Sequence, residues 1–178
     1  MCSGECILRA TLRAFEASKQ INPSYASAYL SIGRILEQRG DASGAIENYR
    51  RAVRLFPASA AAHFHLATQL LKTAQREEAI AEYREALKLG PKIPDAHNNL
   101  GFLLAANGEI EAPREHFTAA IQLNPRHALA YYNLGMLTLS TGDAQRAAEY
   151  FARALELRPG TPEIERALAA ARARQAGR

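Results

Sequence analysis

Hydrophobic residues recur along this chain with the spacing of an α-helix. In four segments, an aromatic or histidine residue is followed three, four and seven positions later by mostly apolar or small residues, which form one stripe on a helix face. The stripes are Tyr29, Ile32, Gly33 and Leu36; His63, Leu66, Ala67 and Leu70; His97, Leu100, Gly101 and Leu104; and Tyr131, Leu134, Gly135 and Thr138. No stretch alternates apolar and polar residues over the length of a strand, so the pattern predicts an all-helical fold.

The stripes belong to a longer period that other residues share. Proline recurs every 34 residues, at positions 23, 57, 91, 125 and 159. The residue eight positions before each proline is aromatic: Phe15, Tyr49, Tyr83, Phe117 and Phe151. Turn signals follow the stripes at Gly40-Asp41, Gly108-Glu109 and Gly142-Asp143, with Ala74-Gln75 as the weak member. Several columns in register over four periods predict a series of helical hairpins.

Small residues at positions 33, 67, 101 and 135 predict a close crossing of the two helices in each hairpin, because a larger side chain would push the helices apart. The recurring prolines are expected to end the second helices. Pro94 is expected to open a first helix, and Pro113 to fall in the first turn of a helix that begins near Glu111. Thr138 replaces a larger residue and predicts slightly looser packing in the last hairpin.

These columns resemble the tetratricopeptide repeat family, whose helix-turn-helix unit combines an aromatic residue, a Leu-Gly pair, an alanine-aromatic-alanine series and a closing proline. The resemblance implies an all-α, right-handed superhelical solenoid of antiparallel helix pairs. We predict four full repeats, at residues 26–59, 60–93, 94–127 and 128–161. Residues 1–25 are expected to form a half repeat with only a second helix, at about 8–22, and residues 162–178 a capping, solvating helix and tail. The missing first helix leaves open whether the chain is a fragment of a longer protein.

The net charge of +4 is spread thinly, with +3 in residues 1–59, −1 in 60–127 and +2 in 128–178. Nucleic-acid binding needs a concentrated basic surface, so we expect no nucleic-acid partner. The amino terminus lacks the pattern of a signal peptide, and no apolar run approaches the length of a membrane span. These observations predict a soluble cytoplasmic protein without a membrane partner.

Residues able to carry chemistry are sparse. Cys2 and Cys6 have no second pair or nearby histidine to complete a metal site, which favours two thiols without a redox or metal role. His63 and His65 should point to different sides of a helix, and His116 and His127 lack an obvious partner. No phosphate-binding loop or nucleophile motif is present. We therefore predict no catalytic activity, no metal and no cofactor.

The family resemblance places a concave groove on the face of each first helix opposite the stripe. Apolar residues stand beside amides on this face, a composition typical of peptide-binding grooves. We predict that the groove is formed by Leu30, Arg34, Phe64, His65, Asn98, Asn99, Phe102, Tyr132, Asn133 and Met136. The alternative is that the apolar members, Leu30, Phe64, Phe102 and Met136, pack against the adjacent repeat.

Asn99 and Asn133 occupy equivalent positions in the third and fourth repeats. Their column is similar to the asparagine ladder of protein O-GlcNAc transferase, although only two of its four positions here are asparagine. The basic clamp with which chaperone co-factors bind acidic carboxy-terminal tails has no match. We predict a non-catalytic scaffold that binds a peptide segment of a partner protein. The alternatives are a substrate-recruiting segment of a larger glycosyltransferase or sulfotransferase, and self-association through Leu8, Leu12 and Phe15.

Overall fold

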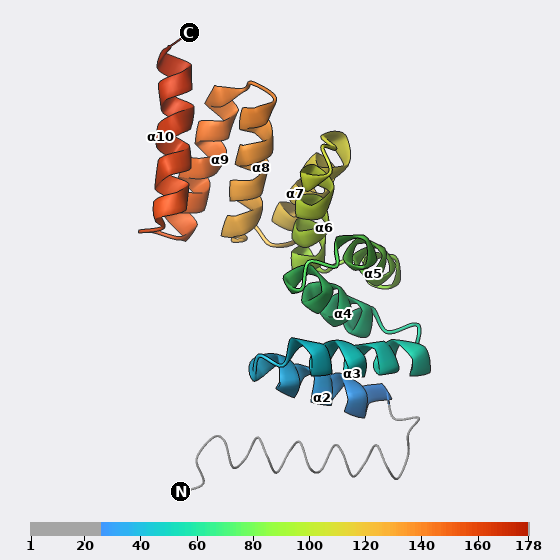
Figure 1. The fold of residues 1–178 in the computed structure, drawn as a ribbon. Coiled ribbons are helices and arrows are strands. Elements are labelled where there is room, and N and C mark those ends of the chain that lie inside the picture. The colour runs from blue at the N-terminus through green and yellow to red at the C-terminus, as the bar shows by residue number, and fades with distance from the viewer. Residues whose placement is uncertain (1–25, 178) are drawn as a thin grey trace, which may run out of the picture. The chain divides into compact units, whose positions relative to one another are not determined.

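The structure is a computed structural model and describes residues 26–177, which form nine α-helices and no strand (Figure 1). The helices are α2 (Ala26–Gln38), α3 (Ala42–Leu55), α4 (Ala60–Lys72), α5 (Arg76–Leu89), α6 (Pro94–Ala106), α7 (Glu111–Leu123), α8 (Ala128–Ser140), α9 (Ala144–Leu157) and α10 (Pro162–Ala176). The all-helical prediction is confirmed for these residues. The half repeat expected in 1–25, with Cys2, Cys6 and the self-association residues Leu8, Leu12 and Phe15, lies outside them.

The chain divides into two compact units between Pro91 and Lys92. In unit 1, α2 packs against α3 and α4 against α5, and the two hairpins meet through α3 and α4. In unit 2, α6 packs against α7, α8 packs against α9, and α7 contacts α8. Helix α10 packs against α9. Each unit therefore contains two stacked helical hairpins, with α10 added in unit 2.

Glycines in the first helices allow the aromatic side chains of the second helices to approach the backbone. The aromatic column is fully buried at Tyr49, Tyr83, Phe117 and Phe151. A Cβ atom added to each glycine would come within 3 Å of an aromatic ring: 2.5 Å for Gly33 and Tyr49, 2.9 Å for Gly101 and Phe117, and 2.7 Å for Gly135 and Phe151. The predicted close crossing is confirmed at these three glycines.

The turn inside each hairpin uses one residue with a left-handed backbone conformation. Gly40, Gly108 and Gly142 have φ angles of +78°, +85° and +94°. Ala74 occupies the equivalent position and adopts the same conformation, with φ at +61°. The turn signals are confirmed, including the weak one, where an alanine pays the steric cost that glycine avoids.

The prolines lie at helix boundaries, as predicted. Each second helix ends two residues before its proline, with last residues Leu55, Leu89, Leu123 and Leu157. Pro94 is the first residue of α6, and Pro113 lies in the first turn of α7, which begins at Glu111. At both positions the missing amide hydrogen would have had no partner within the helix.

Helix α10 covers the last aromatic of the series. Leu168 and Ala171 of α10 are buried in one cluster with Ala147 and Phe151 of α9. Thr138 of α8 is also buried, and its hydroxyl donates to the carbonyl of Leu134 at 2.7 Å. The polar atom of Thr138 is therefore satisfied within its own helix. The four repeat boundaries and the capping role of residues 162–178 remain predictions.

Candidate functional site

The predicted groove residues of unit 1 differ in their exposure. Arg34 of α2 is exposed, whereas Leu30 of the same helix is half-buried and packs on a cluster of Tyr29, Ala52 and Ala62. Ala62 belongs to α4, the first helix of the next hairpin. Leu30 therefore packs toward the adjacent hairpin, as the alternative interpretation of the groove face predicted. The side chain of Arg34 is exposed to solvent.

Phe64 and His65 of α4 are half-buried and contact other aromatic rings. His65 stacks on Tyr49 with ring centroids 5.4 Å apart and an angle of 20° between the planes. Phe64 lies 6.2 Å from Tyr83 of α5 and meets His65 edge to face at 5.4 Å. Both side chains therefore present one edge to solvent and use the other for packing within unit 1.

Glu37 was not among the predicted groove residues, but its carboxylate contacts side chains from two other helices of unit 1. Its Oε2 accepts a hydrogen bond from the hydroxyl of Tyr49 at 2.9 Å, and its Oε1 accepts one from Lys72 Nζ at 2.9 Å. His65 Nδ1 lies 3.9 Å from the same carboxylate. Glu37 and Lys72 are 35 positions apart, so the two ends of the ion pair come from α2 and α4.

The Glu37 cluster shifts three pKa values. Burial opposes ionisation of Glu37, but the hydrogen bonds from Lys72 and Tyr49 outweigh it and lower the pKa of the carboxyl group. Burial, together with the hydrogen bond to Glu37, raises the pKa of Tyr49. Burial also lowers the pKa of His65, despite the nearby carboxylate. At neutral pH the cluster therefore holds an ionised Glu37 beside a neutral His65.

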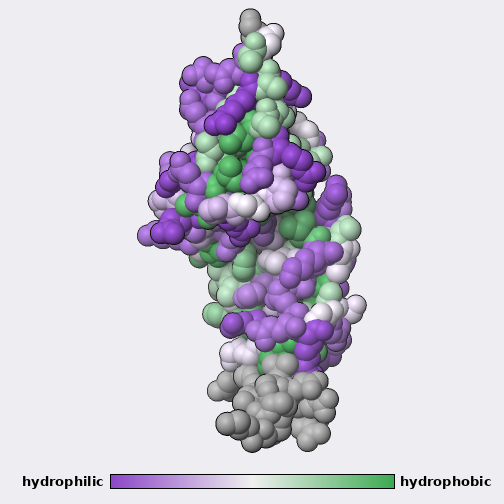
Figure 2. Space-filling model, turned by 90° about the vertical axis from the view of Figure 1, so that its left-hand side faces the viewer, coloured by the Kyte–Doolittle hydropathy of each residue, from purple (hydrophilic) through white to green (hydrophobic). Residues whose placement is uncertain are grey.

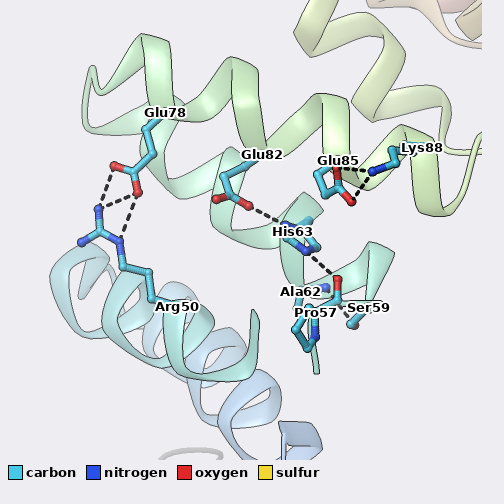
Figure 3. Close-up of polar contacts among 9 residues, drawn as sticks. All are labelled: Arg50, Pro57, Ser59, Ala62, His63, Glu78, Glu82, Glu85 and Lys88. Carbon is cyan, nitrogen blue, oxygen red and sulfur yellow. Dashed lines mark hydrogen bonds and ion pairs between the residues drawn. The ribbon is translucent and has the colours of Figure 1, made fainter. Parts of the chain in front are cut away.

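Polar side chains also join the helices of unit 1 at His63 and Arg50 (Figure 3). His63 lies between the carboxylate of Glu82, 2.5 Å from its Nδ1, and the carbonyl of Pro57, 3.0 Å from its Nε2. Arg50 of α3 donates to both oxygens of Glu78 of α5, at 2.8 Å each. His63 is buried, in agreement with its predicted place in the packed stripe.

The amides of unit 2 form a chain of hydrogen bonds. Asn133 Nδ2 of α8 donates to Asn98 Oδ1 of α6 at 2.9 Å, and Asn98 Nδ2 donates to Asn99 Oδ1 at 3.1 Å. Asn98 is only 2% exposed. The three amides are therefore paired with one another, because α8 packs against α6. Asn98 is therefore a buried hydrogen-bond partner of Asn99 and Asn133 and is too enclosed to contact a ligand.

Unit 2 also contains a cavity of about 370 Å³ between α6, α7 and α8. Its lining residues are Phe102, Ala105, Ala106, Phe117, Tyr132, Asn133, Met136, Leu137 and Ser140. Four of the predicted groove residues are among them: Phe102, Tyr132, Asn133 and Met136. The other five were not among the predicted site residues: Ala105, Ala106, Phe117, Leu137 and Ser140. They carry little side-chain chemistry or belong to the packed side of the hairpin.

Two apolar side chains at this cavity remain in solvent. Phe102 is 50% exposed and Met136 is 44% exposed. Tyr132 is more enclosed, since its ring lies 5.7 Å from that of Phe151. On the face shown in Figure 2, hydrophilic residues predominate and hydrophobic residues form narrow strips between them. The cavity therefore gathers two of the exposed large apolar side chains of unit 2, where Ile110, Leu123 and Leu129 are also exposed.

The histidines of unit 2 have partners that the sequence did not indicate. His97 Nδ1 lies 3.0 Å from His116 Nδ1. His127 Nε2 lies 3.0 Å from Asp95 Oδ1, and its Nδ1 accepts from the amide of Ala130 at the start of α8. The expectation that His116 and His127 lack an obvious partner was wrong. Within residues 26–177, no group of three potential ligands is arranged for a metal ion.

None of the described helices combines the length and apolar character needed to cross a membrane.

Known proteins share this architecture. Structures of MamA and of YrrB superpose with TM-scores of 0.77 and 0.80, at 24% and 22% identity. The MamA match covers 88% of this chain and 95% of the other, and the YrrB match covers 93% and 85%. The PilF protein of Pseudomonas aeruginosa matches with a TM-score of 0.74 and 28% identity, over 85% of this chain and 69% of the other. No curated protein sequence matches.

Two family models match most of the described chain. A model described as TPR repeat covers residues 33–73 and 75–108, and one described as Tetratricopeptide repeat covers 103–162. The matched residues include the last three of the four stripes, the glycine turns, and the prolines that follow the second helices. The all-α repeat solenoid and the two family matches agree, and the chain is a member of the tetratricopeptide repeat family.

Proposed function

We propose that this protein binds a peptide segment of a partner protein on the groove face of its first helices and catalyses no reaction. As a tetratricopeptide repeat protein, the chain is a protein-interaction scaffold. The observation that carries the finer proposal is the cavity in unit 2, where Phe102 and Met136 are exposed beside the amide of Asn133. The solved structure of YrrB is described as that of a repeat protein with an unusual peptide-binding site, which is consistent with such a use of the fold.

The chemistry of this face suits a bound peptide. Each apolar anchor buried by a peptide contributes about 1.5 to 3 kcal/mol, and each amide hydrogen bond about 0.5 to 1.5 kcal/mol. A few contacts of each kind must also offset the entropy of ordering the peptide. We therefore expect a dissociation constant of roughly micromolar order.

Substitution of the groove amides tests the proposal. Peptides selected by phage display against the full chain would be measured by fluorescence anisotropy against wild type and the Asn99→Ala, Asn133→Ala double variant. We expect the double variant to bind about tenfold more weakly, since it loses one or two amide contacts. Circular dichroism should show unchanged helicity.

The matched control replaces an amide away from the groove. Gln122 of α7 is exposed and lies outside the cavity, so Gln122→Ala should bind like wild type. Equal affinity of all three proteins for every selected peptide would argue against the groove face. A selection that enriches no binding peptide would argue against peptide binding itself.

A further inference from the structure

We infer that the cavity of unit 2 holds one large uncharged apolar side chain of the bound peptide, of leucine or phenylalanine type, while Asn133 Oδ1 accepts a hydrogen bond from the backbone of the same residue. This inference rests on the proposed function and specifies what the peptide must present. It draws on three observations: the composition of the cavity lining, the small residues that open the cavity, and the fixed orientation of the Asn133 amide.

The lining excludes charge. None of the residues around the cavity is charged at neutral pH, and their polar groups are the Asn133 amide and the hydroxyls of Tyr132 and Ser140. A lysine or glutamate side chain placed there would lose its hydration without gaining an ionic partner. A volume of about 370 Å³ lies at the lower end of the range for ligand pockets. It therefore suits one side chain with adjoining backbone.

Two consecutive alanines open this cavity. Ala105 and Ala106 line it, near the end of α6. In unit 1, the residues 34 and 68 positions earlier are larger: Leu71 and Lys72 of α4, and Glu37 and Gln38 of α2. Lys72 and Glu37 are also engaged with each other there. The pair of small residues is therefore a local feature of unit 2 and is not repeated in the hairpins of unit 1.

The hydrogen-bond chain fixes which end of the Asn133 amide meets a ligand. Because Asn133 Nδ2 donates to Asn98 Oδ1, the other end of the amide, Oδ1, is available as an acceptor. Among the described residues, none donates to this oxygen. Asn98 is itself held by its buried position and by its bond to Asn99. The preferred partner group is consequently a donor, and a peptide backbone supplies an N–H beside every side chain except that of proline.

A minimal peptide mimic tests the inference without knowledge of the partner. The sequence contains only two methionines, Met1 and Met136, so a protein labelled with ¹³C in its methionine methyl groups gives one reporter in the cavity and one at the amino terminus. N-acetyl-L-leucine methylamide should shift the Met136 signal with a dissociation constant of about millimolar order and leave the Met1 signal unmoved.

Two analogues separate the parts of the inference. N-acetyl-L-lysine methylamide, with a free side-chain amine, should bind at least about tenfold more weakly, because its charge has no partner in the cavity. The leucine mimic methylated on both backbone nitrogens keeps the side chain but has no N–H to donate. It should bind about threefold to tenfold more weakly.

A cavity-filling variant provides the protein-side test. Ala105→Leu introduces the residue that already stands at the equivalent positions Leu71 and Leu139, so the hairpin should accept it. Binding of the leucine mimic should fall by about tenfold or more. Ala170→Leu, at an exposed position of α10, is the matched control and should leave binding unchanged.

The outcomes distinguish this inference from the proposed function. An unmoved Met136 signal at the highest soluble concentration of the leucine mimic would overturn the inference, and so would equal binding of the lysine mimic. Selected peptides that still bind the chain would then leave peptide binding standing. If Met136 responds as expected but none of the selected peptides binds, the inference about the cavity holds and the proposed function fails.

Discussion

Gln69 is a polar residue that is buried in the apolar core. Its side chain is 2% exposed in α4, and its Nε2 has no hydrogen-bond partner in the described part of the chain. The other first helices carry Ile35, Leu103 and Leu137 at the same position of the 34-residue register, and all three are buried. An unpaired buried donor costs about 1 to 3 kcal/mol.

We therefore expect Gln69→Leu to raise the free energy of unfolding by about 1 to 2 kcal/mol. The substitution removes the unsatisfied amide at nearly constant volume and matches the residue found in two of the other hairpins. Urea denaturation followed by circular dichroism would measure the change. Gln122→Leu, at an exposed position, is the control and should have no comparable effect. A lower midpoint for Gln69→Leu would mean that the amide is satisfied in solution.

Ala74 is a second residue that lowers the stability of the fold locally. It is the only described non-glycine residue with a positive φ angle. We expect Ala74→Gly to stabilise the chain by about 0.5 kcal/mol, because relief of the left-handed strain exceeds the added entropy of the unfolded glycine. Gly108→Ala makes the reverse change, at a φ of +85°, and should destabilise by about 1 kcal/mol. Thermal denaturation of both variants checks the pair. Shifts of the same sign would contradict the strain argument.

At the scale of helices, the Glu37 cluster links three elements of unit 1. Glu37 lies on α2, its hydroxyl donor Tyr49 on α3, and Lys72 and His65 on α4. The folded protein lowers the pKa of His65 below its ordinary 6.5 and that of Glu37 below its ordinary 4.5. For both groups, the unfolded chain binds a proton more readily than the folded one as the pH falls.

The sign of the pH dependence follows from these directions. The contribution of His65 is fully present above its unfolded pKa near 6.5 and is lost as the pH falls through its lower folded pKa. The contribution of Glu37 is lost in the same direction, at pH values below its ordinary 4.5. We expect His65→Gln to reduce the loss of unfolding free energy between pH 7 and pH 5. Urea denaturation at both pH values measures this, and identical losses in wild type and variant would refute it.

The sequence predicted the helices well because their signals are local. Gly33, Gly101 and Gly135 mark the crossings, and the glycine turns and prolines mark the ends, all in a register that repeats four times. The candidate site was predicted only in part. Phe102 and Met136 are exposed as expected, but the burial of Asn98 and the opening left by Ala105 depend on how α8 closes over α6. A helix register gives the direction of a side chain and not the neighbour that covers it.

At the scale of the whole molecule, stability in a repeat protein is built from contacts between neighbouring elements. Helix α10 contacts α9 and, more weakly, α8, and it buries Leu168 beside Phe151. The effect of a change in α10 should therefore fade with distance along the chain. It should be largest in unit 2, where α10 packs on the buried residues of α9.

We expect Leu168→Ala to lower the stability of unit 2 by about 2 kcal/mol, because it removes a buried side chain from the last cluster. Hydrogen exchange followed by mass spectrometry should show faster exchange in α8, α9 and α10 than in wild type. Helices α2 to α5 should change little. Ala170→Leu, already a control for the cavity, should leave exchange unaltered, and a uniform acceleration along the whole chain would contradict neighbour-limited stability.

The pair of residues 19 positions apart in each hairpin has a consequence for design. In α4 and α5 the pair is His63 and Glu82, and in α6 and α7 it is His97 and His116. The register gives Tyr131 and Tyr150 in the last hairpin. Two hairpins thus make the same cross-hairpin contact with different groups, a histidine with a carboxylate in one and two histidines in the other. An engineer could exchange these two pairs between hairpins, and so change the polar link between the two helices without redesigning the backbone.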